Sequence, residues 1–377
     1  MPVLDVLAPV RYPWRFNSPR NSRHRIDIRR FVPFNRLDRR IEGITVFDPW
    51  PPRRFDLVHA FNRLPLGTTP YVVGFESHLP RAYGLESSRY YAALRRSLAG
   101  SRCRKIIAIS HHAEAIFRQT HAASECWEEL AAKLVVRHPN VDLGTFSDEA
   151  PSLRSDDPVR VAFVGAHFAR KGGCVAVRLA ELARERGLPL TMTIVSTLEM
   201  GGGIWTDPLR EGYFDDWKRR LANPAITHID RLDNPATLAL FSASHFSLLT
   251  TFGDTFGYSA IEAMQTFCPV IATDQGALPE FIVDGSNGWL VSLPTSAVGE
   301  WTQSSAPDRG TPAFERLFSD EVERMAEAAL AVIVASLEDP VRYAGVRQRA
   351  RETVEIRFDS RPANLWWDDL YETAVAG

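Results

Sequence analysis

The chain has 377 residues, of which 45% are apolar and 24% charged, so it can bury two hydrophobic cores. Its longest apolar run, 328–337, is far shorter than the roughly 20 residues of a membrane-spanning helix. The sequence also opens without a charged segment followed by an apolar run. We therefore expect a cytoplasmic protein, and four scattered cysteines argue against a disulfide scaffold.

The two halves of the chain differ in charge. Residues 1–140 hold 23 Arg and Lys against 12 Asp and Glu, whereas the remainder holds 21 against 34. This asymmetry predicts two domains with different partners. Ten arginines fall within residues 1–40, among aromatic residues that we expect to contact an anionic membrane surface: Trp14, Phe16, Phe31, Phe34, Phe47 and Trp50.

That basic surface has other interpretations. The arginines could instead pair with acidic residues of the second domain, with the aromatic residues in the core. Nucleic-acid binding is disfavoured, because the aromatic residues do not form the interleaved platform pattern of such proteins and no matching motif is present.

The first half carries short apolar segments between turn residues. Residues 1–35 are predicted to be irregular because five prolines interrupt them. Four segments are predicted as buried parallel strands: 43–47, 57–60, 71–75 and 105–109. Ser110 is predicted to cap the following helix. The turn-rich segment 138–158 places the domain boundary near residue 150.

The second half alternates strands and helices. Strands are predicted at 159–165, 190–195, 225–229, 245–250, 269–273 and 288–291. Helices are predicted from residue 174 and at 215–222, 235–243, 258–267, 278–283, 320–337, 341–357 and 362–373. This rhythm predicts a doubly wound parallel sheet, in which ligands bind at the carboxyl ends of the strands.

The stretch GDTFGYSAIEAM (253–264) places two carboxylates around a strand-to-helix loop. The amides of Gly257, Tyr258 and Ser259 would begin the helix and could hold a phosphate. Glu262, one turn further on, could accept hydrogen bonds from a ribose diol, and Asp254 could hold hydroxyls of the group that the phosphate carries. The alternative is that Asp254 only forms the turn and Glu262 is a solvated helix carboxylate.

The wider sequence resembles the family-4 retaining glycosyltransferases of the GT-B fold. The resemblance lies in DTFGYSAIEAMQTFCPVIATDQGALPEFIVDGSNGWLV (254–291), which has the family's spacing of acidic residues, a G-x-x-E turn and a D-G-x-N-G-x-L-V segment. VAFVGAHFARKGG (161–173) and HPNVD (138–142) resemble the family's first strand with its K-G turn and its interdomain segment. The N-terminal half matches less well.

The resemblance implies an architecture. It implies two doubly wound Rossmann-like α/β domains that face each other across a cleft. Residues 1–150 would bind the acceptor and residues 151–357 the nucleotide sugar, and the C-terminal helix 358–377 would return to the N-terminal domain. The acceptor is expected to be a cell-envelope glycan, such as lipopolysaccharide, or a lipid-linked saccharide, reached in the cytoplasm or at the inner face of the membrane.

The resemblance also implies a mechanism without a protein nucleophile. The donor diphosphate would be held by Gly165, Arg170 and Lys171 together with the helix start at Gly257, Tyr258 and Ser259. Attack would come from the front side of the sugar, with anomeric configuration retained. Because the sequence has no D-x-D triplet, we expect neither a metal site nor any cofactor other than the nucleotide-sugar substrate.

Three positions depart from the family pattern. Asp254 stands where glutamate is usual, so the sugar hydroxyls within its reach are not predicted. Ala166 stands where an arginine is frequent, and Arg170 is the candidate replacement. Ala277 stands where many members have a second glycine.

In the first half, Glu76, Ser77 and His78 follow a predicted strand, and family members often have a histidine there that faces the donor sugar. Glu76 and His78 are therefore candidate catalytic residues, against the alternative of a surface glutamate and a buried loop histidine. A related nucleotide-sugar epimerase, a sugar phosphorylase and a non-catalytic nucleotide-sugar binder remain as other possible functions.

Overall fold

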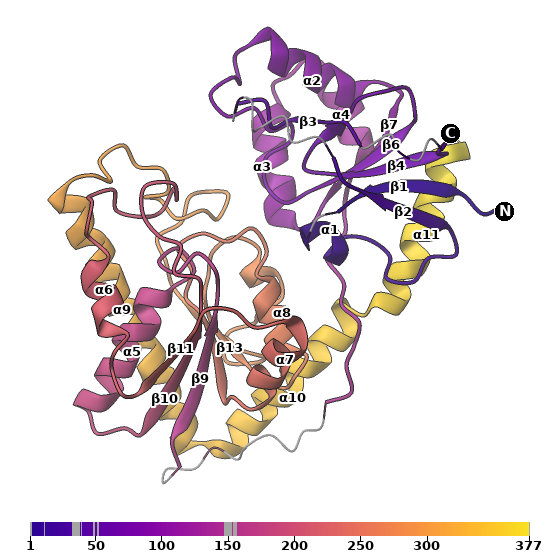
Figure 1. Cartoon of the computed structure of the whole chain (residues 1–377). Helices are drawn as coiled ribbons and strands as arrows, with labels where there is room; N and C mark the ends of the chain where they lie inside the picture. The colour runs from indigo at the N-terminus through magenta and orange to yellow at the C-terminus, as the bar shows by residue number, and fades with distance from the viewer. Residues whose placement is uncertain are drawn as a thin grey trace. The chain divides into compact units, whose positions relative to one another are not determined.

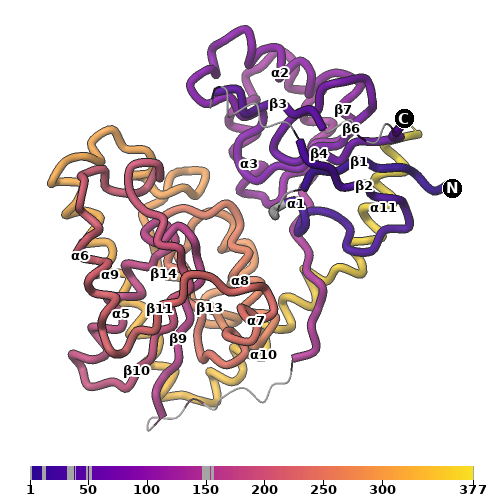
Figure 2. Tube along the Cα trace, in the orientation of Figure 1, coloured from indigo at the N-terminus to yellow at the C-terminus, as the bar shows by residue number. Residues whose placement is uncertain are grey.

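The computed structural model describes residues 2–10, 12–31, 38, 40–47, 50, 53–146, 153 and 157–376 (Figure 1). Contacts divide the chain into two compact units: Met1–Leu143 with Arg357–Gly377, and Gly144–Ile356. The expected boundary between residues 150 and 151 lies outside the described residues. The chain enters the second unit after β8 (Leu134–Val136), and the trace in Figure 2 returns along α10 (Pro340–Arg357).

The first unit is built on a parallel sheet with strand order β2-β1-β4-β6-β7-β8. Its strands are β1 (Asp5–Pro9), β2 (Arg25–Arg29), β4 (Leu57–Phe61), β6 (Tyr71–Phe75), β7 (Cys103–Ala108) and β8 (Leu134–Val136). Its helices are α1 (Tyr12–Phe16), α2 (Arg89–Ala99), α3 (His111–His121), α4 (Trp127–Lys133) and α11 (Ser360–Ala376). Strands β3 (Ile44–Thr45) and β5 (Leu64–Pro65) form a separate small sheet.

The C-terminal helix completes this unit, as the sequence predicts. Trp367 and Tyr371 of α11 are fully buried and pack with Leu57, Val72 and Ile107 of the sheet. Residues of α2, α3 and α4 join a second cluster with the strands. The sheet is therefore covered by α11 through one cluster of apolar side chains and by α2, α3 and α4 through another.

Two predictions for the first unit are wrong. Residues 1–35 are not irregular, because β1 and β2 pair in the main sheet from Asp5↔Arg25 to Pro9↔Arg29. Pro9 is tolerated because it is the last residue of β1, and the arginines of β2 are compatible with its position at the sheet edge. The expected strand 43–47 is reduced to β3, which pairs with β5 outside the main sheet.

The second unit contains a parallel sheet with order β11-β10-β9-β12-β13-β14. Its strands are β9 (Val159–Val164), β10 (Leu190–Val195), β11 (Ile226–Ile229), β12 (Phe246–Leu249), β13 (Val270–Thr273) and β14 (Trp289–Val291). Its helices are α5 (Gly173–Glu185), α6 (Asp215–Arg220), α7 (Asn234–Ser242), α8 (Tyr258–Met264), η2 (Leu278–Glu280), α9 (Pro312–Glu338) and α10. The predicted helix 278–283 is only the short 3-10 turn η2.

Helices cover both faces of this sheet. In Figure 1, α5, α6 and α9 lie on one side of it, and α7, α8 and α10 on the other. The fully buried side chains of Phe163, Phe168 and Phe318 belong to its main core. This is the doubly wound arrangement that the β-α rhythm of the sequence predicts. No helix among the described residues has the length and apolar character needed to span a bilayer.

Candidate functional site

The strand order of the second unit determines where a ligand would bind. Numbered along the chain, its strands run 3-2-1-4-5-6. The winding direction therefore reverses between the paired strands β9 and β12, and this place is the topological switch point of the sheet. In open α/β sheets, ligands bind outside the carboxyl ends of the strands at such a reversal. The loops that leave β9 and β12 are 165–172 and 250–257, and these carry most of the predicted donor-binding residues.

Lys171 and Asp254 join these two loops. The Lys171 Nζ donates a hydrogen bond to Asp254 Oδ2. Asp254 is only 9% exposed. Burial by itself raises the pKa of this carboxyl, but the nearby Lys171 and Arg170 cations outweigh burial and lower the pKa below its usual value. Asp254 is therefore ionised, and the pair places a cation at the reversal.

Arg170 lies deeper than Lys171. It is 7% exposed, and its Nη1 donates to the carbonyl oxygen of Gly253 at 2.5 Å. Its own carbonyl accepts from the Phe252 amide at 2.8 Å and from Thr251 Oγ1 at 2.9 Å. Arg170 thus links the two loops by hydrogen bonds. Its predicted contact with a diphosphate stays a prediction.

Glycines allow close packing in these loops. A Cβ on Gly165 would lie 2.9 Å from the Cβ of Lys171. Gly257 has a φ of +92°, and a Cβ there would lie 2.6 Å from Leu278 Cδ2. Tyr258 and Ser259 then form the first turn of α8, where we expected a phosphate. The positive φ of Gly257 directs the chain from the loop into this helix.

Glu262 is oriented by a residue that the sequence did not indicate. It is 6% exposed, and its Oε1 accepts a hydrogen bond from Asn234 Nδ2 at 2.7 Å. Asn234 is the first residue of α7, which Asp233 caps by accepting from the Ala236 amide. An ionised carboxylate has about four acceptor positions, so Glu262 can bind a diol while it is held by Asn234.

Three further residues approach the same loops and were also missed. His167 lies in the loop after β9, 3.3 Å from Glu199 Oε2, and burial lowers its pKa. Gln275, after β13, accepts from the Asp254 amide through Oε1. Trp205, after β10, lies over Arg170. For His167 and Gln275, the position just after a strand end was the available signal, whereas Trp205 lies in the long connection between β10 and α6. No motif marked any of the three.

The candidates of the first unit lie after β6. Glu76 Oε1 accepts from Arg81 Nη2 at 2.8 Å and from Asn62 Nδ2 at 2.9 Å. Arg81 also pairs with Glu42. This network supports a structural role for Glu76. His78 is exposed two residues further on, and its predicted role at the donor sugar stays a prediction.

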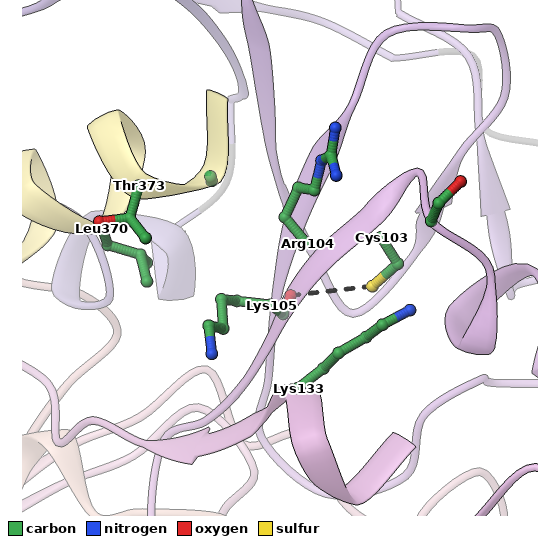
Figure 3. A pocket seen from close by; sticks show the side chains of 8 residues that line it. Cys103, Arg104, Lys105, Lys133, Leu370 and Thr373 are labelled. Atoms are coloured by element: carbon green, nitrogen blue, oxygen red, sulfur yellow. Dashed lines mark hydrogen bonds between the residues drawn. The ribbon is translucent and has the colours of Figure 1, made fainter. Parts of the chain in front are cut away.

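A pocket of about 260 Å³ in the first unit is unrelated to the switch point (Figure 3). It lies beside Cys103 at the start of β7, and Arg104, Lys105 and Lys133 are among its lining residues. Lys133 Nζ donates to the carbonyls of Leu98, Ala99 and Gly100, so it caps the end of α2. Burial raises the pKa of Cys103 to about 12, so this thiol is not a nucleophile.

The residues around the switch point fall within a known domain. Residues 158–303 match the family model described as Glycosyl transferases group 1. This part of the chain is therefore similar to group 1 glycosyltransferase domains. The match includes both loops of the switch point and all six strands of the second unit's sheet, β9 to β14.

Curated relatives of the group 1 domain carry the name D-inositol 3-phosphate glycosyltransferase. The protein from Pseudarthrobacter chlorophenolicus is 28% identical over 215 residues, which are 54% of this chain and 46% of the relative. The protein from Mycobacterium tuberculosis strain F11 is 29% identical over 185 residues, 46% of this chain and 35% of the relative. The chain thus spans less than half the length of these relatives.

Solved structures share the fold of the whole chain. Anabaena Alr3699/HepE in complex with UDP and glucose aligns over 98% of this chain and 100% of its own, with a TM-score of 0.59 and 16% identity. A glycosyltransferase from Rickettsia africae aligns over 100% and 99%, with a TM-score of 0.62 and 14% identity. The chain has the GT-B fold, as the sequence predicts.

Proposed function

We propose that the chain is a retaining glycosyltransferase that moves a sugar from a nucleoside diphosphate sugar to a hydroxyl acceptor. The Lys171–Asp254 pair at the switch point carries this proposal, because it sets a cation and a carboxylate side by side at the ligand edge of the group 1 domain. Relatives with this fold bind UDP and glucose, so UDP-sugars are the first donors to test.

Each part of the donor has a counterpart among these residues. Glu262, held by Asn234, binds the ribose diol. Lys171 and the first turn of α8 bind the diphosphate. Asp254 accepts hydrogen bonds from hydroxyls of the transferred sugar. As the bond between the sugar and the diphosphate breaks, negative charge grows on the departing phosphate, and Lys171 stabilises it most in the transition state.

In this proposal the first unit binds the acceptor. By the charge of that unit, we propose an acceptor that is anionic or carried by an anionic lipid, such as a cell-envelope saccharide. Unit 1 holds 25 Arg and Lys against 17 Asp and Glu, a net charge of +8. Positive potential of this size attracts negative ligands and surfaces.

Donor turnover tests the proposal. The chain is incubated with a panel of UDP-, GDP- and ADP-sugars and candidate acceptors, with and without EDTA, and release of nucleoside diphosphate and the anomeric signal of the product are measured. We expect release with one donor, unchanged by EDTA, with a product of the same anomeric configuration. Interconversion of the donor sugar without release would indicate an epimerase, and consumption of a sugar with inorganic phosphate a phosphorylase.

A Lys171→Met variant completes this test. We expect kcat to fall by about tenfold to a hundredfold, with a smaller change in donor binding, because the charge that Lys171 meets grows in the transition state. Lys218→Met, a change of an exposed lysine on α6, is the matched control. An equal effect of both variants would contradict the assignment of Lys171.

A further inference from the structure

Trp205 is an exposed aromatic residue beside the switch point. It retains 43% of its accessible surface, although the residues that follow it, Thr206 and Asp207, are fully buried. It belongs to the long connection between β10 and α6, in a segment that begins with Gly201, Gly202 and Gly203. Exposed tryptophans are common on binding surfaces. Trp205 is a candidate for a ligand site if its backbone is held in a defined position.

The backbone around Trp205 is held firmly. The carbonyl of Trp205 accepts from the Ser305 amide at 2.7 Å, and the carbonyl of Ile204 accepts from Arg309 Nη1 at 2.6 Å. Thr206 Oγ1 donates to Asp207 Oδ1 at 2.9 Å, and Asp207 Oδ2 accepts from the Gly201 amide at 2.9 Å. The buried contacts on both sides fix the position from which the indole projects.

The indole faces the loop that carries Asp254. The guanidinium carbon of Arg170 lies 4.7 Å from the ring centroid, so Arg170 supports the ring by a cation–π contact. A Cβ on Gly253 would lie 3.3 Å from Trp205 Nε1. Glycine at 253 therefore leaves room for the indole next to Asp254.

A buried side-chain amide, that of Gln275 after β13, approaches the same loop. Gln275 is 2% exposed, and its Nε2 has no hydrogen-bond partner in the described structure. The Asp254 amide donates to Gln275 Oε1 at 3.4 Å, which assigns the other end of the amide as the nitrogen. A buried donor without an acceptor is destabilising, so a ligand oxygen at this position would relieve that penalty.

We propose that Trp205 and Gln275 form, around Asp254, the subsite for the transferred sugar. The indole packs against the C–H face of the sugar ring, and Gln275 Nε2 donates to a hydroxyl that Asp254 does not bind. The inference rests on the proposed function and names the residues that select the sugar. The sugar is placed beside Asp254 because the other parts of the donor already have partners: Lys171 is assigned to the diphosphate, and the Glu262–Asn234 pair to the ribose.

Calorimetric titration with UDP-glucose and with UDP tests this subsite. We expect Trp205→Ala to weaken UDP-glucose binding by about fivefold to fiftyfold, comparable to the loss of an aromatic stacking contact, and to change UDP binding less than twofold. Trp205→Phe should recover most of the affinity. Gln275→Leu should weaken UDP-glucose binding and leave UDP binding unchanged. Trp50→Ala, at an exposed tryptophan of the first unit, should change neither.

The outcomes separate this inference from the proposed function. If the wild-type protein binds UDP and UDP-glucose and Trp205→Ala weakens both equally, Trp205 stacks on the base or acts through Arg170, and the sugar subsite is wrong. If the wild-type protein binds no nucleotide and no nucleotide sugar of the UDP, GDP or ADP series, the proposed function itself fails. Unfolding temperatures within about 2 °C of wild type confirm that the variants are folded.

Discussion

At the scale of single residues, the orientation of Glu262 depends on Asn234. The bond from Asn234 Nδ2 fixes Oε1 of a carboxylate that would otherwise sample other rotamers. We expect Asn234→Ala to raise the donor KM by about threefold to tenfold, since a net hydrogen bond is worth about 1 kcal/mol. Steady-state kinetics measure this change. Asn223→Ala, which removes a turn bond to the Ala225 amide, is the control and should leave KM unchanged.

Asp207 makes stability depend on pH. Its burial is the main reason that its pKa is raised to about 6, although the Gly201 amide, Thr206 and Arg170 oppose the shift. Between about pH 4 and 6 the folded state therefore binds a proton that the unfolded state has lost. The contribution of Asp207 to the free energy of unfolding should fall as pH rises through this window and stay constant above it.

Asp207→Asn removes this titration and tests it. The amide can still accept from Gly201 and face Thr206, so the loop keeps its bonds. We expect the unfolding temperature of the variant, compared with that of wild type, to rise from pH 4.5 to pH 7. The reason is that the folded variant has no proton at position 207 to release. Thermal unfolding at several pH values measures the difference. A difference that is the same at all pH values would contradict the raised pKa.

Sequence reasoning reached only some of these residues. Two short motifs contain Lys171, Asp254, Gly257 and Glu262. The proximity of the last three follows from one loop, and that of Lys171 to them follows from the strand order. Partners that approach from other strands carry no local pattern. Asn234 precedes Glu262 by 28 positions and reaches it only because α7 packs on α8. Such contacts depend on tertiary packing, which spacing within one motif does not encode.

At the scale of elements, the turn between β9 and α5 requires glycine at position 172. Gly172 has a φ of +98°, and a Cβ there would lie 2.5 Å from the carbonyl oxygen of Thr250. Gly187 has a φ of +70° with no atom within 4 Å of its Cβ position. We expect Gly187→Ala to lower the unfolding temperature by about 2–4 °C, the cost of backbone strain alone.

Gly172→Ala should lower the unfolding temperature at least twice as much, because the methyl group also displaces the Thr250 backbone and with it the loop to Asp254. Differential scanning calorimetry of both variants gives the comparison. Similar shifts for the two variants would show that the loops after β9 and β12 adjust easily.

The elements of the first unit were harder to predict than those of the second. Strands β9, β10 and β12 are predominantly apolar and mostly buried, as strands of a covered parallel sheet are. β2 reads RIDIR, with an exposed arginine at Arg25 and a buried one at Arg29, and β1 ends in proline. Edge position permits polar residues and a terminal proline, and this position is known only once the sheet is assembled.

At the scale of the whole molecule, the first unit depends on the last residues of the chain. Trp367 and Tyr371 fill one face of its sheet, and Tyr371 is hydrogen-bonded to His59 Nδ1 at 2.7 Å. Trp367→Ala should destabilise this unit by about 3–5 kcal/mol. Leu365→Ala, at an exposed position of the same helix, should be nearly neutral. Hydrogen exchange in β4 and β6 should increase only in the first variant, and an increase in the second unit alone would contradict this dependence.

The surface of the first unit determines whether it binds a membrane. Several of its arginines pair within the unit: Arg23 with Asp369 and Glu372, Arg25 with Asp5, and Arg40 with Asp38. Trp14 and Phe16 are buried, so they cannot enter lipid as expected, and Phe34 and Arg11 lie outside the described side chains. Phe31 and Phe47 are half-buried, whereas Trp50 is 77% exposed. The exposed Arg54, which the sequence did not single out, follows Trp50 by four positions.

We therefore expect weak, salt-sensitive attachment to anionic vesicles rather than firm insertion. A net charge of +8 attracts the surface, at roughly 1 kcal/mol for each basic residue near the lipid, but internal ion pairs reduce the number available. In liposome flotation, the protein should float with vesicles that contain an anionic lipid at low salt and should be released at 0.5 M salt, where the screening length is only a few ångströms. Trp50→Ser combined with Arg54→Glu should reduce flotation, whereas Arg342→Glu in the second unit should not. Equal recovery with zwitterionic and anionic vesicles would leave an enzyme whose acceptor is not presented by a charged membrane.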